Sequence, residues 1–428
     1  MDGLSVPVST SKALRAPVRR STVGMWSGVA VLLVGASMAV LVGRDGAAGW
    51  QITRVAVTAG LTWAAVLAVT RGRVLVRGAV GLGVGILGTA VGAGIAVPHA
   101  AAVGWAVATV AGAVCLAAGL ALLVGGAVTT ARAVPRWWGR VLAIPAVILT
   151  VYAGVYALAL AVAVTNVPVT AVGQADPAGA GLAFRDVSLT TPDGVQLSGW
   201  YIPGSSGAAI ALVHGSGSTR SDVLPHAQVL ARNGFGILLF DSRGHGRSVG
   251  RAMDFGWYGD QDVTAAVDFL ASRPEVTGGR IGVVGISMGG EEAIGAMAAD
   301  PKIRAVVAEG ATNRTAADKA WLPTVYGVRG TLQQALDTVM YATADLLTDA
   351  APPIPLRDAV ARAAPRPVLL ITAGAVPDED AAARYIQAGS PDTVDILTVP
   401  GAPHAGGLAT DPALWQTRVT TFLKSNLR

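Results

Sequence analysis

The feature that most constrains this chain is a long stretch without ionisable acids or strong bases: no Asp, Glu, Lys or Arg occurs from Gly78 to Ala131. About 20 apolar residues cross the hydrocarbon core of a bilayer as a helix that rises 1.5 Å per residue. The stretch is too long for one such helix. It therefore predicts a membrane region with more than one span.

The whole chain divides into two regions, one suited to the lipid bilayer and one suited to water. Only 14% of the 428 residues are charged, against roughly 25% in an average soluble domain. The shortfall is confined to the N-terminal half, because mixed charges occur throughout the chain from Arg185 onward. The sequence thus predicts an N-terminal membrane region and a C-terminal soluble domain.

The apolar runs predict about five membrane spans within residues 23–167. Pro98 and His99 divide the long uncharged stretch into a helical hairpin, since proline interrupts helices. The first run is longer than the apolar core of a signal peptide and four more runs follow it, so we expect it to be retained. Frequent glycines predict close helix–helix approach; a phosphate-binding loop is excluded because no strand precedes them and no Lys-Ser/Thr follows. The expected spans are 23–43, 55–70, 79–97, 103–130 and 141–167.

Basic residues set the expected orientation of these spans. Cytoplasmic loops are enriched in Lys and Arg, and the rich segments alternate here with poor ones. A basic tail (residues 1–22) and the second and fourth loops are therefore expected in the cytoplasm, and a domain after five spans on the outer face of a plasma membrane. The rich segments contain Lys12, Arg15, Arg19 and Arg20, then Arg71, Arg73 and Arg77, then Arg132, Arg136 and Arg140; the first loop has only Arg44 and Arg54. Residues 168–183, rich in Ala, Gly and Pro, are expected to be a flexible linker.

Alternating strands and helices over residues 184–428 predict a mostly parallel sheet with helices on both faces. A turn signal at Pro192-Asp193-Gly194 joins the first two strands as a hairpin. The expected strands are 184–190, 195–202, 208–213, 236–240, 280–286, 303–308, 367–372 and 394–399, and the expected helices are 221–233, 259–271, 288–299, 380–388 and 412–427.

The motif Gly285-Ile286-Ser287-Met288-Gly289 lies where an expected strand meets an expected helix. Such a strand–turn–helix with Gly-x-Ser-x-Gly is typical of a nucleophile elbow, whose sharp turn leaves no room for side chains at the glycines. A chance match in a Gly-rich chain is the alternative, and the strand before and helix after the motif argue against it.

With this motif, the segment 184–428 resembles the α/β-hydrolase superfamily, near its esterase and lysophospholipase-like members. The resemblance implies that Ser287 is the nucleophile and that His404, in the loop after the last strand, is the general base. The segment His214-Gly215-Ser216-Gly217 resembles the family's oxyanion loop, which implies that the backbone N–H groups of Ser216 and Met288 form the oxyanion hole. His214 and His245 are then expected to support their loops.

The resemblance places the acid after the penultimate strand, but this chain departs from the family's usual spacing. At the expected offset from Gly374 stands Pro377, and the carboxylates follow it. We favour Asp378 over Glu379, because Asp380 is expected to open the helix and point away. Acids that simply favour a helix start are the alternative for all three.

Residues 310–365 form an insertion in which the family often places a lid. Its apolar content is consistent with a lipophilic substrate site and equally with packing onto the core. The residues concerned are Trp321, Tyr326, Met340, Tyr341, Leu346 and Leu347.

The expected activity is hydrolysis of a carboxylic ester, either a small molecule or a lipid, through an acyl-enzyme on Ser287. Acyl transfer, peptide hydrolysis and a non-catalytic membrane scaffold or receptor are the alternatives. Spans without internal acids or Lys favour an anchor over a transporter. No cofactor, metal site or nucleic-acid partner is expected, the single Cys115 excludes an intrachain disulfide, and the oligomeric state is unknown from the sequence.

Overall fold

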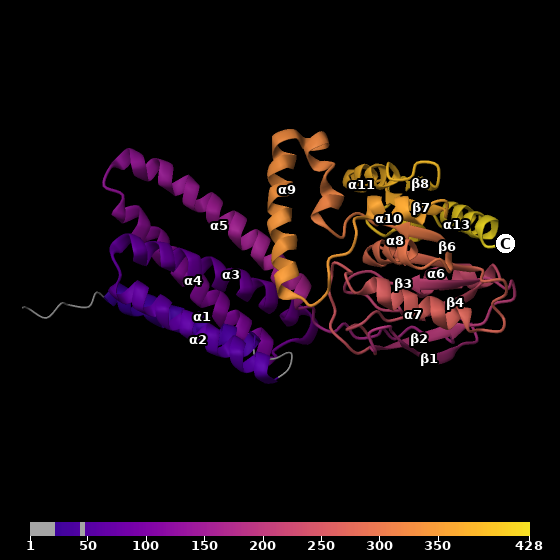
Figure 1. Cartoon of the computed structure of the whole chain (residues 1–428), viewed down its shortest axis with the longest axis horizontal. Coiled ribbons are helices and arrows are strands. Elements are labelled where there is room, and N and C mark those ends of the chain that lie inside the picture. Colours follow the sequence, from indigo (N-terminus) through magenta and orange to yellow (C-terminus); the bar gives the residue numbers. More distant parts are fainter. Residues whose placement is uncertain (1–21, 43–47) are drawn as a thin grey trace, which may run out of the picture.

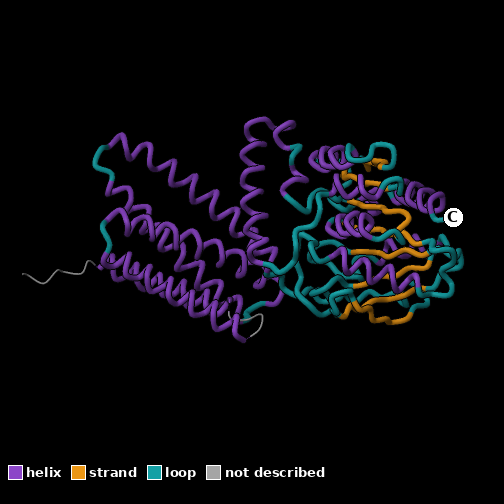
Figure 2. Tube along the Cα trace, in the orientation of Figure 1, coloured by secondary structure: helices purple, strands orange, loops and turns teal. Residues whose placement is uncertain are grey.

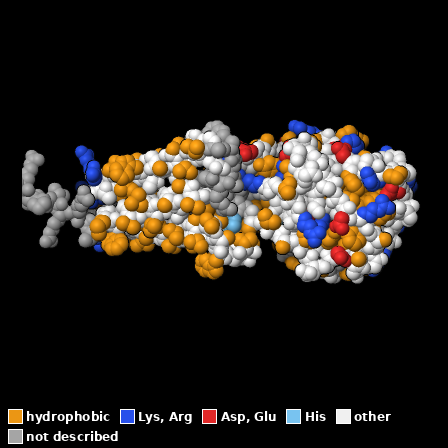
Figure 3. Space-filling view, turned by 90° about the horizontal axis from the view of Figure 1, so that it is seen from below, with side chains coloured by type: hydrophobic (Ala, Val, Ile, Leu, Met, Phe, Trp, Pro, Cys, Tyr) orange, Lys and Arg blue, Asp and Glu red, His pale blue; other side chains and the backbone are white. Residues whose placement is uncertain are grey.

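The computed structural model describes residues 22–42 and 48–428, which form two bodies joined side by side (Figure 1). One body contains only helices, and the other is a sheet covered by helices (Figure 2). Apolar side chains cover much of the surface of the helical body, whereas charged side chains are spread over the other (Figure 3). The expected basic tail, 1–22, lies outside the described residues except for its last position, and so does Arg44.

The helical bundle contains five helices that are long and apolar enough to cross a membrane, as the sequence predicts. Their boundaries lie within five residues of the expected spans, except at the hairpin and at the start of α2, which begins seven residues before the expected span. The helices are α1 (Thr22–Val42), α2 (Ala48–Arg71), α3 (Val74–Val103), α4 (Val107–Ala133) and α5 (Trp137–Thr165).

The hairpin turns later than predicted, because Pro98 lies inside α3 and does not end it. Proline removes one helical hydrogen bond, but apolar bundles tolerate this when neighbouring helices support the backbone. The helix ends instead at Gly104, whose φ of 69° is unfavourable for residues with a Cβ. Thr109 then donates to the Gly104 carbonyl over 2.7 Å and fixes the start of α4.

The glycines of α3 and α4 allow the close helix–helix approach that the sequence predicts. A Cβ added at Gly92 would lie 2.3 Å from the backbone nitrogen of Leu116, and one at Gly119 would lie 2.3 Å from that of Thr89. Real side chains do not come so near, so only glycine permits this backbone-to-backbone packing. The bundle is therefore held by complementary shape rather than by large interlocking side chains.

The second body is built on an eight-stranded sheet with the order β1-β2-β4-β3-β5-β6-β7-β8. Strand β2 runs antiparallel to both of its neighbours, β1 and β4. The remaining neighbours in the sheet, β4-β3-β5-β6-β7-β8, all pair in parallel. The predicted hairpin is present, with Thr190 opposite Gln196. The strands are β1 (Arg185–Thr190), β2 (Gln196–Ile202), β3 (Ala209–Val213), β4 (Gly236–Phe240), β5 (Ile281–Ile286), β6 (Ile303–Glu309), β7 (Val368–Ala373) and β8 (Val394–Val399).

Helices cover both faces of this sheet, as predicted, and bury one apolar core on each face. The first core lies under α7 (Gly259–Ala271), α8 (Met288–Ala299), α10 (Leu356–Ala363) and α11 (Pro377–Gln387). The second lies under α6 (Leu224–Arg232) and α13 (Pro412–Asn426), with the single turn α12 (Gly407–Thr410) beside them. Burial of the central strands β3, β4 and β5 is complete, as their continuous runs of apolar residues require.

Two segments lie at the junction of the bodies. Helix α9 (Leu322–Leu347) stands between them and packs against α5 (Figure 1). Residues 168–183, expected to be a flexible linker, lie instead against the sheet domain: Gly246 donates to the Thr170 carbonyl over 2.8 Å, and Val172 and Leu182 pack on the second core. This correction arises because apolar residues scattered among the Ala, Gly and Pro give the segment a surface on which to pack.

Candidate active site

Ser287 occupies a sharp turn between β5 and α8. Its φ of 54° is one of two positive values among the non-glycine residues of the described chain. A Cβ at Gly285 would lie 2.1 Å from the Gly289 carbonyl oxygen, and one at Gly289 would lie 2.5 Å from the His214 carbonyl oxygen. Both glycines of the motif are therefore required by the turn, as a nucleophile elbow demands.

His404 joins Ser287 to a carboxylate in one continuous chain of hydrogen bonds. Its Nε2 lies 2.8 Å from Ser287 Oγ, and its Nδ1 lies 2.6 Å from Glu379 Oε1. Because a carboxylate only accepts, Nδ1–H must donate to Glu379, which leaves Nε2 of the neutral ring free to accept the serine proton. The second carboxylate oxygen, Oε2, accepts from the Ala373 amide over 2.8 Å and is thereby fixed.

The preference for Asp378 as the acid is wrong, because Glu379 is the residue that contacts His404. The reason is the start of α11, which begins at Pro377, three residues before the expected start at Asp380. Both acids lie in its first turn, where successive side chains point about 100° apart. Glu379 faces inward with only 3% of its side chain exposed, while Asp378 is exposed and accepts from the Tyr326 hydroxyl.

The Glu379 carboxylate changes the pKa of His404. The hydrogen bond to Glu379 raises the pKa of His404 above its ordinary value, and partial burial opposes this less strongly. Half of the His404 side chain is exposed, so a substrate can approach the ring from solvent. An imidazole with a raised pKa is a stronger base toward the serine hydroxyl.

The loop expected to supply the oxyanion hole lies directly beside Ser287. A Cβ at Gly215 would lie 3.2 Å from the Ser287 Cβ, so a side chain at this position would crowd Ser287. Met288 is the first residue of α8, and the amides in the first turn of a helix have no partner within the helix. The loop and the helix start thus flank Ser287 from two sides.

His214 supports this loop, as the sequence predicts, and does not act as a base. Its Nε2 accepts from the Ser242 amide over 3.0 Å, which makes Nδ1 the donor to the Gly215 carbonyl at 2.8 Å. Complete burial lowers the pKa of His214 to about 3, so the ring stays neutral. The charge of His214 therefore does not change in the neutral pH range.

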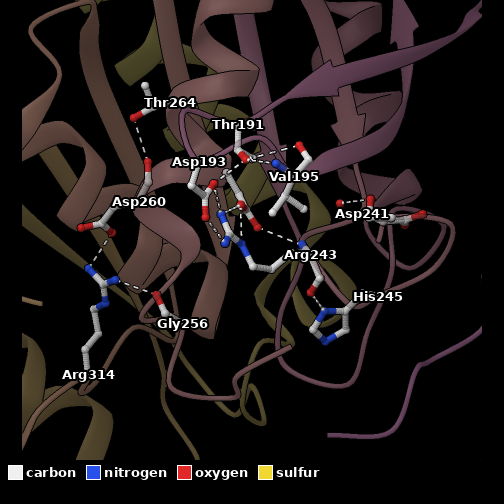
Figure 4. Close-up of polar contacts among 12 residues, drawn as sticks. Thr191, Asp193, Val195, Asp241, Arg243, His245, Gly256, Asp260, Thr264 and Arg314 are labelled. Atoms are coloured by element: carbon white, nitrogen blue, oxygen red, sulfur yellow. Dashed lines mark hydrogen bonds and ion pairs between the residues drawn. The ribbon is translucent and has the colours of Figure 1, made fainter. Parts of the chain in front are cut away.

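A network of largely buried charges fixes the segment after β4 (Figure 4). Arg243 forms ion pairs of 2.7 Å with both Asp193 and Asp262, and Arg314 pairs with Asp260 over 2.8 Å. His245 is also structural, since its Nδ1 lies 3.1 Å from the Arg243 carbonyl. These contacts join the β1–β2 turn, α7 and the insertion to one rigid frame.

Glu309 was missed by the sequence reasoning. It ends β6 and is buried, and its carboxylate accepts from the Gly407 amide and from Trp415 Nε1, each over 2.7 Å. Its carbonyl also accepts from the Ser287 amide over 2.6 Å. Glu309 therefore ties the loop of His404 and the elbow of Ser287 to the same strand end. The sequence signal that could have indicated Glu309 is an acid directly after the apolar run of β6.

Glu291, four residues after the nucleophile, was also missed. It is buried in α8 and accepts from the amides of Thr312 and Asn313 over 2.9 Å each, which anchors the beginning of the insertion. Burial raises the pKa of Glu291 to about 7, although these two hydrogen bonds oppose the rise.

The insertion 310–365 divides between two roles. Helix α10 is part of the first core, so it is not a lid. Met340 and Tyr341 of α9 pack against Ala157 and Ala161 of α5, which favours packing over substrate binding for this part. Leu346 and Leu347, by contrast, line an open cavity at the junction of the two bodies.

This sheet order, with its antiparallel second strand and its serine elbow after β5, gives the C-terminal body the α/β-hydrolase fold. The family model described as serine aminopeptidase, S33, matches residues 204–356. The chain is 34% identical over 162 residues to an uncharacterized protein of Mycobacterium tuberculosis, which covers 36% of this chain and 55% of the relative; the chain thus spans about half the length of that protein. It is also 34% identical over 128 residues to the thiohydrolase aneE of Aspergillus aculeatus, covering 29% of this chain and 40% of the relative.

Among solved structures, an esterase of Pyrococcus furiosus, Pf2001, is similar with 25% identity and a TM-score of 0.48. The similarity covers 61% of this chain and 97% of that one.

Proposed function

We propose that this protein is a membrane-anchored serine hydrolase that cleaves carboxylic esters. The observation that carries the proposal is the continuous contact from Ser287 Oγ through His404 to the buried Glu379. A histidine that is hydrogen-bonded on one side to a carboxylate and on the other to a hydroxyl is the arrangement that activates serine.

In the proposed reaction, Ser287 Oγ attacks the ester carbonyl carbon while its proton passes to His404 Nε2. The amides of Met288 and Ser216 stabilise the oxyanion, and each such donor contributes about 10²–10³ in rate. Collapse of the intermediate breaks the bond to the leaving alcohol, which takes the proton from His404. Water then repeats these steps on the acyl-enzyme, with His404 as base, and releases the carboxylic acid.

Glu379 has two tasks in this scheme. It holds the imidazole in the tautomer that presents a bare Nε2 to the serine, and it stabilises the cation that forms when the proton arrives. Its burial strengthens both effects, because fewer water molecules screen the carboxylate from the ring.

Labelling with a fluorophosphonate probe, which phosphonylates activated serines, tests the proposal. Wild-type membranes should give a labelled band that Ser287→Ala and His404→Ala both abolish, with unchanged protein amounts. An Asp378→Asn variant is the matched control and should label like wild type. Absence of labelling in folded wild-type protein would overturn the proposed mechanism. A positive result is followed by p-nitrophenyl esters of increasing acyl length to define the substrate.

Peptide hydrolysis is the second candidate, favoured by the description of the matching family model. The same serine would attack an amide, and p-nitroanilides of amino acids and short peptides distinguish the two activities. A kcat/KM for anilides above that for esters would replace esters by peptides as the substrate class.

The anchoring part of the proposal rests on the bundle. Basic residues gather at the end of the bundle that lies away from the hydrolase domain: Arg71, Arg73, Arg77, Arg132, Arg136 and Arg140 all lie at or near helix ends there. Exposed Trp137 and Trp138 lie at the same level, as interfacial belts require. The distribution supports a cytoplasmic location for this end and an outer location for the hydrolase domain.

Cysteine labelling in intact cells tests the orientation. In a Cys115→Ser background, Asp395→Cys on the exposed face of β8 should react with a membrane-impermeant maleimide. Pro135→Cys, in the loop between α4 and α5, should react only after lysis. The reverse pattern would place the hydrolase domain in the cytoplasm.

A further inference from the structure

An open cavity of about 410 Å³ lies at the junction of the bundle and the hydrolase domain. Its walls come from both bodies: Leu87 and Ile95 of α3, Leu158 of α5 and Leu346 of α9. A second cavity of about 350 Å³ shares four of its residues, including Ile95 and Arg251. Volumes of this size are typical of ligand sites.

The cavity is amphipathic. Apolar side chains from the helices form its walls, whereas Arg54, Asn166 and Arg251 lie among its polar lining. Asp349 is the single acid in the lining, and it does not form an ion pair with Arg251, so the Arg251 guanidinium can attract an anionic group. A ligand that matches both parts has an apolar tail and an anionic head.

Arg251 is held where it can receive such a head. Its Nε donates to the Thr165 carbonyl at the end of α5 over 3.0 Å, and Nη2 donates to the same oxygen. Among the residues that the structure describes, no carboxylate lies within ion-pair distance of its guanidinium. The positive charge is therefore fixed in place by carbonyls and not neutralised by an acid.

The position relative to the bundle identifies the source of the ligand. The apolar walls belong to helices long enough to span a bilayer, and the polar part lies at the ends of those helices next to the hydrolase domain, where lipid headgroups would be. Because Leu346 is 86% exposed, the cavity is open and a lipid can enter from the side.

We propose that this cavity binds one anionic membrane lipid, with its phosphate at Arg251 and an acyl chain along α3, α5 and α9. The inference rests on the membrane insertion included in the proposed function, but not on catalysis. Such a lipid would also fill the space beside α9, the helix that reaches Tyr326 and its contact with Asp378 at the edge of the candidate active site.

Native mass spectrometry of the full chain tests the proposal after exchange into detergent with phosphatidylglycerol or phosphatidylcholine. The Ser287→Ala background prevents turnover of the lipid and separates binding from activity. We expect one phosphatidylglycerol retained per chain, with a preference of about tenfold over phosphatidylcholine. Equal retention of the two lipids would overturn the charge assignment. Displacement by glycerol 3-phosphate at equal concentration would indicate a soluble anion and would overturn the lipid.

Filling the cavity provides the second arm. Leu158→Trp should reduce phosphatidylglycerol retention about tenfold, while Leu160→Trp, on the same helix but outside the cavity lining, should leave it unchanged. Leu346→Gln, at an exposed position that folding does not require, should also reduce retention. Arg251→Gln should remove the preference for the anionic lipid and Arg251→Lys should restore it. Lipid retention that is the same in Leu158→Trp, Leu346→Gln and the Leu160→Trp control would overturn the site.

Discussion

The two bodies of this protein differ in how their interiors are packed. In the bundle, backbones touch through glycines such as Gly92 and Gly119, and the buried polar side chains of the described helices are hydroxyls. In the hydrolase domain, full-sized side chains fill two cores, and charges such as Arg243, Asp262 and Glu309 are buried with partners.

The difference shows what each body is built to do. Buried charges cost free energy unless they are paired and hydrogen-bonded, so a domain that retains them uses them to fix positions. Here Glu309 holds the loops that carry Ser287 and His404, and Arg243 with Asp262 holds the segment after β4 against α7. In the described helices of the bundle, close packing of complementary shapes is sufficient for the anchoring role that we propose.

The largest expected effect concerns the two neighbouring acids of α11. Glu379→Gln should reduce kcat by about 10³–10⁴, because the amide no longer fixes the productive tautomer or stabilises the imidazolium. Asp378→Asn should stay within about threefold of wild type, since Asp378 contacts Tyr326 and not the histidine. Hydrolysis of a p-nitrophenyl ester by the purified variants measures both. Equal losses in the two variants would contradict the assignment of the acid.

Backbone packing in the bundle gives the next largest effect. Gly119→Leu should destabilise the protein by about 3 kcal/mol or more, because the new side chain would collide with the backbone of α3 at Thr89. Gly83→Leu is the control: it lies on α3 with no atom within 4 Å of an added Cβ. Thermal unfolding in detergent should show a lower Tm for the first variant only. If both variants unfold alike, shape does not stabilise this bundle.

These two predictions depend on features that the sequence revealed to different degrees. The strands and helices predicted for the sheet domain agree with the structure within three residues, because Gly, Pro and apolar runs mark their boundaries locally, whereas α9 and α10 of the insertion were not predicted. Ser287 and His404 were proposed from a motif and from their order along the chain, and the structure brings them into contact. The choice between Asp378 and Glu379 failed because a helix start displaced by three residues changes which side chain points inward. Glu309 was not found, since its partners at Gly407 and Trp415 are about a hundred residues away.

A smaller effect is expected when Glu309 loses its charge. Glu309→Gln should lower the free energy of unfolding by about 1–3 kcal/mol, because its amide cannot accept from both Gly407 and Trp415 as the carboxylate does. The looser His404 loop should also reduce kcat several-fold. Glu275→Gln is the control, because Glu275 accepts from Tyr201 at the exposed surface and should change stability by less than about 0.5 kcal/mol. Thermal unfolding and ester hydrolysis on the same samples test this contrast between buried and exposed acids.

The smallest expected effect is a shift in the pH dependence of kcat/KM in Glu379→Gln. His404 must be neutral to accept the serine proton, so kcat/KM should fall as pH falls through its pKa, which Glu379 holds above the ordinary value. In Glu379→Gln the main cause of that rise is absent, and the acidic limb of the pH–rate profile should move to lower pH even though the rate is lower everywhere. Asp378→Asn should leave the limb in place. A limb that stays fixed or moves to higher pH in Glu379→Gln would mean that another group controls the profile, and the buried carboxylate would then position the histidine without tuning its basicity.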